Sequence, residues 1–343
     1  MTDLQQTRVS VLIVNWNGLR HLQACLDSLA AQSFRNFEVV LVDNGSVDGS
    51  VAFVRERYPW VQLVELPENS GFAGGNNAGL PSCRGTYVVT LNNDTVTDPG
   101  WLAELVRVAD ANPRAGMVGC RICRNDDPEC LDSLGVKVCA DGNSRGAYRG
   151  ARFSALAVPE VMPILLPSAC AALYRRAMLD EIGFFDEEFF AYCEDTDLGL
   201  RGRLAGWDAL LASNAVVLHK YSQTGGALSP FKLRLVERNH YWAAMKNFPA
   251  TWLLLLPLTT LHRLCWQVRQ FLSGRWRGGA VAEPADLRAL AAAMLAGMGE
   301  ALSGLPQMLA KRRRVQAGRR IRPHELARLL RAYRLSFGEL FHG

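Results

Sequence analysis

The sequence predicts an α/β protein with a doubly wound, mostly parallel sheet and an α-helical C-terminal extension. Three observations carry this prediction. Apolar, β-branched runs alternate with helix-forming segments through residues 9–94, several of these runs end in polar side chains, and the last third of the chain is helical and basic in character. Such alternation is typical of a parallel sheet that is covered by helices on both faces.

Each of the first two expected strands ends in a polar side chain. Residues 9–14 are a nearly continuous run of valine, leucine and isoleucine that stops at Asn15, and leucines at helical spacing then predict an amphipathic helix over residues 19–31. Residues 37–42 predict the second strand, which stops at Asp43. We expect both polar residues at the same edge of the sheet because the strands are parallel.

Two more strands follow after further helices. The third is expected at residues 61–66, and a glycine- and asparagine-rich turn, residues 69–77, then opens a short helix. The fourth strand, residues 85–91, leads into the tripeptide Asn92-Asn93-Asp94. A hard cation such as Mg²⁺ takes few protein carboxylates and completes its shell with water and phosphate oxygens. The tripeptide therefore suits a metal site, although Asn and Asp are also common turn residues.

Polar residues at three strand ends on one edge indicate a nucleotide crevice. The glycine-rich turn lacks the G-x-G-x-x-G spacing of a dinucleotide-binding fold and follows the third strand, which argues against a Rossmann dehydrogenase. The chain also lacks the lysine motif of a P-loop.

The middle of the chain is harder to interpret. We expect one helix at residues 95–115 and a loop-rich, variable lobe over the substrate at residues 120–165. A helix at 177–183 ends in a glycine, and a last strand, residues 209–218, delivers His219 at its end. A lone histidine is more often structural, but this one follows a strand that leads back to the sheet, so a metal role is the alternative.

Glu194 and Asp195 open a helix that is expected to continue to residue 205. They belong to a group of six acids within residues 186–197, which lie among aromatic side chains. Acids are favoured at a helix N-terminus by its dipole, but six exceed what capping requires. Because apolar surroundings raise the basicity of a carboxylate, we expect one of this pair to be a general base.

The nine cysteines are spread along the chain. Cys120, Cys123, Cys130 and Cys139 are spaced too irregularly for a zinc site, and we expect them to be small buried hydrophobic residues. The sequence opens without a charged segment followed by an apolar run, so we expect a cytoplasmic protein.

The charge is divided unevenly along the chain. Residues 1–218 carry a net charge of −9 and residues 219–343 a net charge of +14. The most apolar run, residues 251–261, is shorter than the roughly 20 residues that span a membrane. With a second apolar helix at about 286–310 and basic clusters between Lys311 and Arg322, it predicts a peripheral membrane anchor in which Trp252, Leu253–Leu256 and Trp266 are buried in the lipid. A plain helical cap is the alternative, and nucleic acid is not expected as a partner.

Six motifs occur in an order that resembles family 2 glycosyltransferases with the GT-A fold. The resemblance covers roughly residues 8–225 and is closest to the rhamnosyltransferase-like bacterial members that build cell-surface polysaccharide. The motifs are Val14-Asn15-Trp16-Asn17-Gly18, Val42-Asp43-Asn44-Gly45-Ser46-Val47-Asp48-Gly49, Asn69-Ser70-Gly71-Phe72-Ala73-Gly74-Gly75-Asn76-Asn77, Leu91-Asn92-Asn93-Asp94, Phe185-Asp186-Glu187 and Glu194-Asp195-Thr196-Asp197-Leu198.

The resemblance implies a role for each motif. Asp94 would bind a metal ion on the donor diphosphate, with His219 and Asn92 in its shell, and Asp195, beside Glu194, would be the base. Asn92 stands where the family has Asp, and an amide oxygen is a weaker ligand, which leaves Mg²⁺ or Mn²⁺ open. Asp43 would hydrogen-bond the nucleotide base. The residues implied in nucleotide-sugar binding are Asn15, Asp43, Asn44, Asn69, Gly71, Gly74, Asn76, Asn77 and Asn93.

The resemblance implies a catalytic domain at residues 8–225 and a basic, apolar helical region at 226–343. The implied activity is an inverting, metal-dependent transfer of a sugar, with rhamnose as a candidate. The donor would be a dTDP- or UDP-sugar, and the acceptor a lipid-linked or growing cell-surface glycan at the inner face of the plasma membrane. Two alternatives stay open: a catalytically silent nucleotide-sugar-binding scaffold and a processive polysaccharide synthase. The absence of a Gln-x-x-Arg-Trp motif weighs against the synthase.

Overall fold

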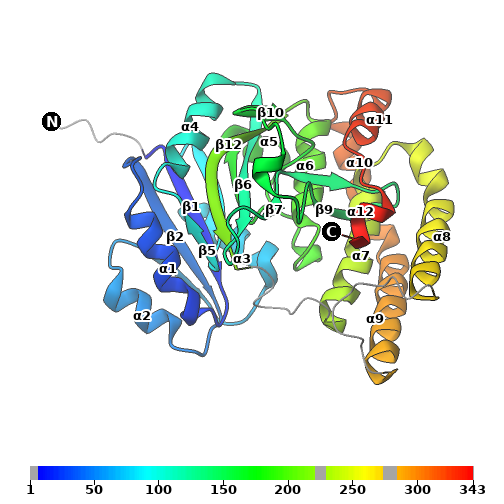
Figure 1. Ribbon diagram of the computed structural model, residues 1–343, viewed down its shortest axis with the longest axis horizontal. Helices are drawn as coiled ribbons and strands as arrows, with labels where there is room; N and C mark the ends of the chain where they lie inside the picture. Colours follow the sequence, from blue (N-terminus) through cyan, green and yellow to red (C-terminus); the bar gives the residue numbers. More distant parts are fainter. Residues whose placement is uncertain (1–6, 221–228, 273–283, 343) are drawn as a thin grey trace.

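The computed structural model describes residues 7–220, 229–272 and 284–342. Its main sheet follows the order β10-β12-β6-β11-β4-β1-β2-β3 (Figure 1). One half of the sheet is purely parallel and consists of the four strands predicted from the N-terminal sequence. They are β1 (Val9–Asn15), β2 (Phe37–Asn44), β3 (Gln62–Leu66) and β4 (Tyr87–Asn92).

The other half of the sheet mixes directions. β11 (Ala171–Arg175) runs antiparallel to β4 and to β6 (Ala115–Arg124), while β12 (Asp208–His219) is parallel to β6. Three short strands complete this half: β5 (Thr95–Thr97), β7 (Leu131–Ser133) and β10 (Val161–Pro163). Most strands of the main path therefore share one direction, which confirms the predicted α/β class and mostly parallel sheet.

Helices cover both faces of the sheet, as a doubly wound fold requires. In β1, Val11 and Ile13 pack in a cluster with α1, α2 and α4, whereas Leu12 packs in a cluster with α3, α5 and α6. This alternation follows from the two-residue period of a strand. The helices are α1 (Leu19–Ala30), α2 (Ser50–Arg57), α3 (Gly71–Gly79), α4 (Trp101–Ala111), α5 (Arg176–Ile182) and α6 (Glu194–Leu204).

Two expectations for the middle of the chain were wrong. The region expected to be one helix, residues 95–115, begins with strand β5, because Thr95, Val96 and Thr97 are β-branched and Pro99 delays the helix to Trp101. The region expected to be loop-rich, residues 120–165, includes the end of β6 and several short strands. Two of these, β8 (Val136–Val138) and β9 (Ser144–Gly146), form a separate hairpin.

Strand β6 was missed because its glycines weaken the sequence signal. A Cβ atom at Gly116 would lie 2.6 Å from Met178 Sδ and 2.9 Å from Trp207 Cβ. Close packing of the strand against these side chains therefore explains a glycine where a strand interior would normally favour a β-branched residue.

The last third of the chain forms helices that pack on α6. Leu200 and Leu204 of α6 share a hydrophobic cluster with Ala244, Phe248 and Leu330 of this region. The apolar helix expected at about 286–310 is two helices, which break before a proline in the first turn of the second. The helices are α7 (Pro230–Asn247), α8 (Ala250–Leu272), α9 (Pro284–Ser303), α10 (Leu305–Ala317), α11 (Pro323–Ala332) and α12 (Phe337–His342).

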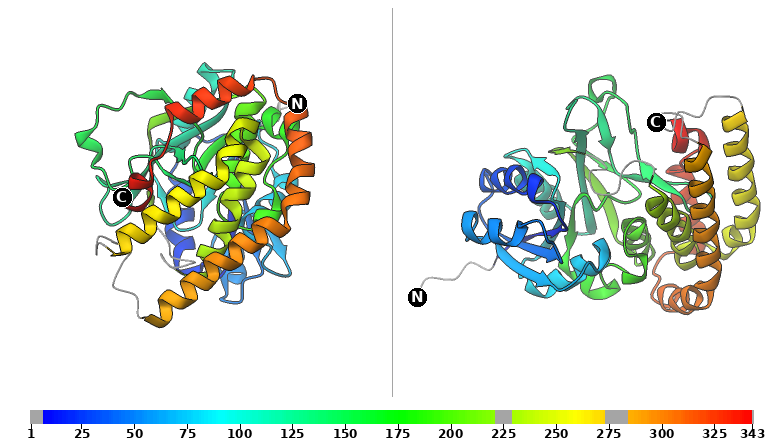
Figure 2. Two further views of the ribbon diagram at one scale, coloured as in Figure 1. Left: turned by 90° about the vertical axis from the view of Figure 1, so that its right-hand side faces the viewer. Right: turned by 90° about the horizontal axis from the view of Figure 1, so that it is seen from below.

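Helices α8 and α9 form an outer layer on the side of the molecule opposite α1 and α2 (Figures 1 and 2). Within the described ranges no single helix is long and apolar enough to cross a membrane. One pair of helices, residues 287–303 and 305–317, which are bent at 58° to each other, has the length and composition of a membrane span, but these are the only two properties that support it. The domain boundary expected between residues 225 and 226 lies outside the described residues.

Candidate functional site

The carboxyl ends of β1, β2 and β4 bring polar side chains into one hydrogen-bonded group. The Asn15 amide donates to Asp43 Oδ1 over 3.3 Å, and the Asn93 amide donates to Asn15 Oδ1 over 2.8 Å. Asp43 Oδ2 accepts from the Ser46 backbone N–H over 2.9 Å. The parallel register of β1 with β2 and with β4 places these residues side by side. The three strand ends predicted to lie at one edge are therefore joined by side-chain hydrogen bonds.

A second group links β2 to the start of α3. Asn44 donates to Asn69 Oδ1 over 3.1 Å and to the Gly71 carbonyl over 2.9 Å, and its own Oδ1 accepts from the Ser70 N–H over 3.0 Å. Gly71 has a φ of +78°, and a Cβ atom there would overlap the backbone of Phe190. These residues fix the turn over the sheet edge through contacts within the chain.

Helix α3 carries the remaining asparagines of the predicted nucleotide-sugar set. Asn76 is buried and donates to the Phe72 carbonyl one turn back, over 2.8 Å. Asn77 exchanges hydrogen bonds with the Phe185 backbone, over 2.8 Å as donor and 3.1 Å as acceptor. Gly74 packs against the Ser70 side chain. The structure thus places Asn77 as a bridge between α3 and the loop before α6.

Asp94 and His219 lie together although they are far apart in sequence. Strand β5 pairs antiparallel with β12 so that Thr95 is opposite His219, and Asp94 Oδ1 lies 3.3 Å from His219 Nε2. On the other side of the ring, Asp132 Oδ2 lies 2.8 Å from His219 Nδ1. Asp132 in turn pairs with Arg149 at 2.5 Å. All three members of the Asp94, His219 and Asp132 group are buried.

This arrangement fits a divalent cation. Ligands at about 2.1 Å on adjacent positions of an octahedral ion lie about 3.0 Å apart, close to the separation of the Asp94 and His219 atoms. A histidine ligand commonly donates its other ring N–H to a carboxylate, the position that Asp132 occupies. Among the described residues no three His, Cys, Asp or Glu side chains enclose an ion, so the protein would offer two such ligands and leave positions for phosphate oxygens. Asn92 is half-buried at the end of β4, two positions before Asp94.

The electrostatics of the pair follow from its partners. Burial alone would raise the pKa of Asp94, but the hydrogen bond and charge of His219 outweigh it and lower the pKa. Burial also disfavours a charged His219, yet Cys170, Asp132 and Asp94 together raise its pKa. The site therefore stabilises positive charge at the point where the ring meets Asp94.

Glu194 and Asp195 begin α6 on the neighbouring side of the site. Asp195 is half-buried, and its carboxylate accepts hydrogen bonds from the backbone N–H groups of Thr196 at 2.7 Å and Ala169 at 3.4 Å. The residue after Ala169 is Cys170, and its carbonyl oxygen accepts a hydrogen bond from the Asn92 N–H over 2.8 Å. One short loop thus connects the acidic pair to the end of β4.

The two acids differ in their surroundings. Glu194 is buried, and its Oε2 atom has no hydrogen-bond partner among the described residues. Burial, and then the charge of Asp195, raise the pKa of Glu194 well above its ordinary value. Burial also raises the pKa of Asp195, but the N–H groups of Ala169 and Thr196 oppose the shift. Asp195 is thus the member of the pair that is better able to hold a negative charge.

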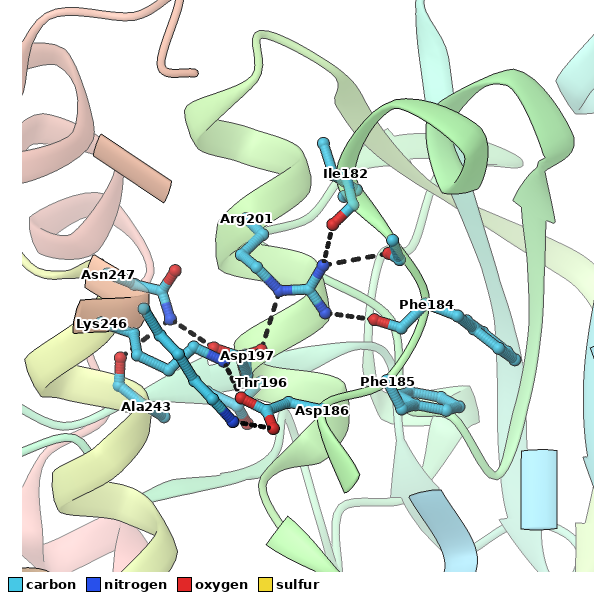
Figure 3. A network of polar contacts seen from close by, with 12 residues as sticks. Ile182, Phe184, Phe185, Asp186, Thr196, Asp197, Arg201, Ala243, Lys246 and Asn247 are labelled. Carbon is cyan, nitrogen blue, oxygen red and sulfur yellow. Dashed lines mark hydrogen bonds and ion pairs between the residues drawn. The ribbon is translucent and has the colours of Figure 1, made fainter. Parts of the chain in front are cut away.

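A buried ionic network lies behind this pair and joins α6 to the C-terminal helices (Figure 3). Lys246 Nζ lies 2.6 Å from Asp186 Oδ2 and 2.9 Å from Asp197 Oδ2. Asp197 also accepts from Arg201 at 2.8 Å and from Asn247 at 2.8 Å. Asp186 and Asp197, which belong to the acidic cluster noted in the sequence, are therefore paired with cations inside the protein.

Sequence reasoning missed Asp132, Arg149 and Lys246. Asp132 lies on a three-residue strand whose pairing with β6 carries no periodic signal. Lys246 is a single cation near the end of α7, where basic residues are common. The acidic cluster at residues 186–197 was the one signal that could have indicated a buried cation, because buried acids require partners.

Comparison with known proteins gives concordant results. The family model described as glycosyl transferase family 2 matches residues 10–183. The N-acetylglucosaminyl-diphospho-decaprenol L-rhamnosyltransferase of Mycobacterium tuberculosis is 30% identical over 250 residues, which are 66% of this chain and 79% of that protein.

Solved structures with the same fold include two that hold nucleotide ligands. Mannosyltransferase PcManGT from Pyrobaculum calidifontis, in complex with GDP-Man and Mn²⁺, matches with a TM-score of 0.53 at 18% identity, over 92% of this chain and 86% of that chain. GalNAc-T7 with UDP, GalNAc and Mn²⁺ matches with a TM-score of 0.59 at 13% identity, over 89% of this chain and 58% of that chain.

Proposed function

Because the chain belongs to glycosyl transferase family 2 and is a nucleotide-sugar-dependent glycosyltransferase with the GT-A fold, we propose that it is inverting and metal-dependent. We propose a dTDP- or UDP-sugar as donor, with rhamnose as the first sugar to test, and a lipid-linked or growing cell-surface glycan as acceptor. The similar mycobacterial protein is named as a rhamnosyltransferase with a lipid diphosphate acceptor, which supports this choice.

The observation that carries the proposal is the meeting of Asp94 and His219 at the edge formed by the strand ends. Asn15 and Asp43 lie along the same edge and would face the nucleoside. Asp94 and His219 would hold Mg²⁺ or Mn²⁺, and Asp132 orients the His219 ring so that Nε2 points towards Asp94. When bound, the ion would neutralise the charge of the departing diphosphate.

Asp195 is proposed as the general base. Its hydrogen bonds from the Thr196 and Ala169 N–H groups fix its orientation, and its partial exposure gives an acceptor hydroxyl access to it. Glu194, buried and with a raised pKa, would be neutral beside it. Proton removal by a base on the side opposite the leaving diphosphate corresponds to single displacement, which inverts the anomeric carbon.

A donor screen tests the function directly. The full chain is incubated with dTDP-rhamnose, UDP-GlcNAc, UDP-Gal or GDP-Man and a short-chain prenyl diphosphate-linked sugar, and release of the nucleoside diphosphate is measured. We expect turnover of a dTDP- or UDP-sugar that requires Mg²⁺ or Mn²⁺ and stops with chelator. Turnover that persists in chelator would refute metal dependence, and a product that keeps the donor's anomeric configuration would refute inversion.

We also propose that the outer layer of α8 and α9 rests on the cytoplasmic face of the plasma membrane. Leu254 and Leu258 on α8 are 80% and 64% exposed, and Leu302 on α9 is 72% exposed. Helix α8 contains no acidic residue, and the chain after residue 218 carries a net charge of +14. An apolar face within a basic region matches an anionic lipid surface.

The residues that would enter the membrane agree only in part with those expected from the sequence: Leu254 and Leu255 are exposed, but the two tryptophans are not free to enter lipid. Trp252 packs on Phe248 with ring centroids 5.7 Å apart, and Trp266 packs against a cluster that contains Cys139 and Leu335. Both tryptophans therefore contribute to the protein interior, and the exposed leucines between and beyond them would make the lipid contact.

Liposome co-sedimentation tests this proposal. We expect the full chain to bind vesicles that contain anionic lipid, to be released in part by high salt and to be released fully by detergent. The variant Leu254→Gln/Leu258→Gln should bind less, whereas Trp60→Gln, at an exposed tryptophan of the catalytic region, should bind like the parent. Equal recovery in the supernatant with and without anionic lipid, at both salt concentrations, would refute it.

A further inference from the structure

A pocket of about 650 Å³ opens beside His219. Its lining is mainly basic: four cationic side chains face two acids, Asp126 and Asp132. The cations are Arg124, Arg145, Arg149 and Lys220. The catalytic lobe is acidic as a whole, with a net charge of −9 over residues 1–218, so this concentration of positive charge is local.

The pocket lies on the other half of the sheet from the proposed nucleotide edge. Its residues come from the end of β6, from β7, from β9 and the turn after it, and from the end of β12. In the strand order β6 and β12 lie beyond β11, β7 pairs with β6, and β9 belongs to the separate hairpin, whereas Asn15, Asp43 and Asn93 belong to β1, β2 and the end of β4. The Asp94 and His219 pair separates the two regions, because β5 pairs with β12.

The arginines of the pocket are held in place by the chain. Arg124 makes a two-point contact with Asp126, at 2.9 Å and 2.5 Å, and Arg149 contacts Asp132 at 2.5 Å. Arg145 donates to the carbonyl oxygens of Glu339 and Leu340 in α12, over 2.9 Å and 2.6 Å. Holding these side chains reduces the entropy that a ligand would have to remove on binding.

A hydrogen bond connects the pocket's strand β9 to the helix that carries the proposed base. Ser144, next to Arg145 on β9, accepts a hydrogen bond from Thr196 Oγ1 over 2.7 Å. Thr196 follows Asp195 at the start of α6. The strand that carries Arg145 is therefore in contact with the helix that carries the proposed base, and His219 is among the residues that line the pocket.

We propose that this pocket binds the phosphate or diphosphate group of the acceptor. The inference rests on the proposed function, and it adds the substrate class that the site selects: an acceptor sugar joined to a phosphate. Arginines bind phosphate oxygens in pairs of directed, charge-assisted hydrogen bonds, and several cations suit a doubly charged group. Bound there, the phosphate would place the acceptor hydroxyl near Asp195, and the donor diphosphate would lie on the nucleotide side of Asp94.

The test separates the acceptor phosphate from the donor phosphate by binding alone, without turnover. Titration calorimetry of the full chain measures UDP and dTDP first. With the tighter nucleotide at saturation, it then measures inorganic pyrophosphate, farnesyl diphosphate and farnesol. The variants are Arg124→Gln and Arg145→Gln. The control is Arg152→Gln, which removes an arginine that is 60% exposed, against 51% for Arg124, that pairs with Asp127 at 3.3 Å and that does not line the pocket.

We expect both pocket variants to weaken pyrophosphate and farnesyl diphosphate binding by about tenfold or more, the effect of losing a charge-assisted hydrogen bond. Nucleotide affinity should change less than about twofold by the same reasoning, and the control should match the parent. An equal loss of nucleotide affinity would assign the pocket to the donor and overturn the proposal. Unchanged pyrophosphate affinity, or farnesol bound as tightly as farnesyl diphosphate, would also overturn it. Because no transfer is measured, a negative result here leaves the donor screen unaffected.

Discussion

Replacing Lys246 by methionine tests whether the C-terminal helices hold α6, the helix that carries the proposed base, through buried charge. Lys246 contacts Asp186 and Asp197, and Asp197 is fully buried. Removing one partner of a buried ion pair costs about 3–5 kcal/mol, because the remaining charge is left in a low-dielectric interior. Asp197 keeps Arg201, and Asp186 keeps Lys311 at 2.5 Å, so we expect the lower end, about 3 kcal/mol.

Urea unfolding followed by circular dichroism measures the change in free energy of unfolding. Lys137→Met is the control, because Lys137 pairs with the exposed Glu339 at 3.3 Å, and a surface pair contributes about 0–1 kcal/mol. The double variant Lys246→Met/Asp197→Asn should lose less than the sum of its single changes, since neither group then carries an unmatched charge. A Lys246→Met variant no less stable than Lys137→Met would refute the reasoning.

The same network predicts a dependence of stability on pH. Burial alone would raise the pKa of Asp197, but Lys246 and Arg201 lower it well below its ordinary value. Asp186 has a lowered pKa for a similar reason, with Lys246 as the main opposing charge. Carboxyls with depressed pKa values contribute stability above the pKa of the unfolded chain, about 4, and lose it as the pH falls through the folded pKa. Unfolding midpoints between pH 5 and pH 2 should therefore fall more steeply for the parent than for Lys246→Met.

Three further predictions concern the site. Asp94→Ala should abolish metal-dependent turnover and keep the parental circular dichroism spectrum; a folded variant with the parental rate would remove Asp94 from the metal site. Asp195→Asn should bind the nucleotide normally and lose kcat, whereas Glu194→Gln should retain most activity; the reverse pattern would exchange their roles. Asp132→Asn should weaken Mn²⁺ affinity by about 10–100-fold, because the amide no longer fixes the His219 ring as the carboxylate does, and unchanged affinity in a Mn²⁺ titration would contradict this.

The N-terminal half of the fold could be predicted because its signals are local. Residues 9–14 and 37–42 are apolar runs buried on both faces of a parallel sheet, and the structure extends each by only one or two residues. The placement of Asn15 and Asp43 at one edge follows from the parallel register alone. A rule about strand ends was sufficient for this part of the candidate site.

The remaining parts of the site depend on tertiary contacts that leave no local pattern. His219 was located by its strand, but its orientation depends on Asp132, which is 87 positions earlier in the chain. The pocket arginines came from a region read as loop, because its strands are three residues long and Arg145 is held by backbone carbonyls of α12. Only the packed structure shows that these groups converge.

The buried network also has a consequence for how the protein is made. Asp197 is synthesised 49 residues before Lys246, and Asp186 is synthesised 125 residues before Lys311. A nascent chain that ends at α6 therefore contains Asp186 and Asp197 without the lysines that pair with them in the folded protein. Helix α6 can reach its final packing only after the last third of the polypeptide has been synthesised. Since domains usually fold in order of emergence, we expect the strands of the sheet to form on the ribosome, while α6, which carries the proposed base, takes its final position only near release. A chain whose translation stops early would then lack an assembled site, and we expect such a truncated protein not to consume activated sugars.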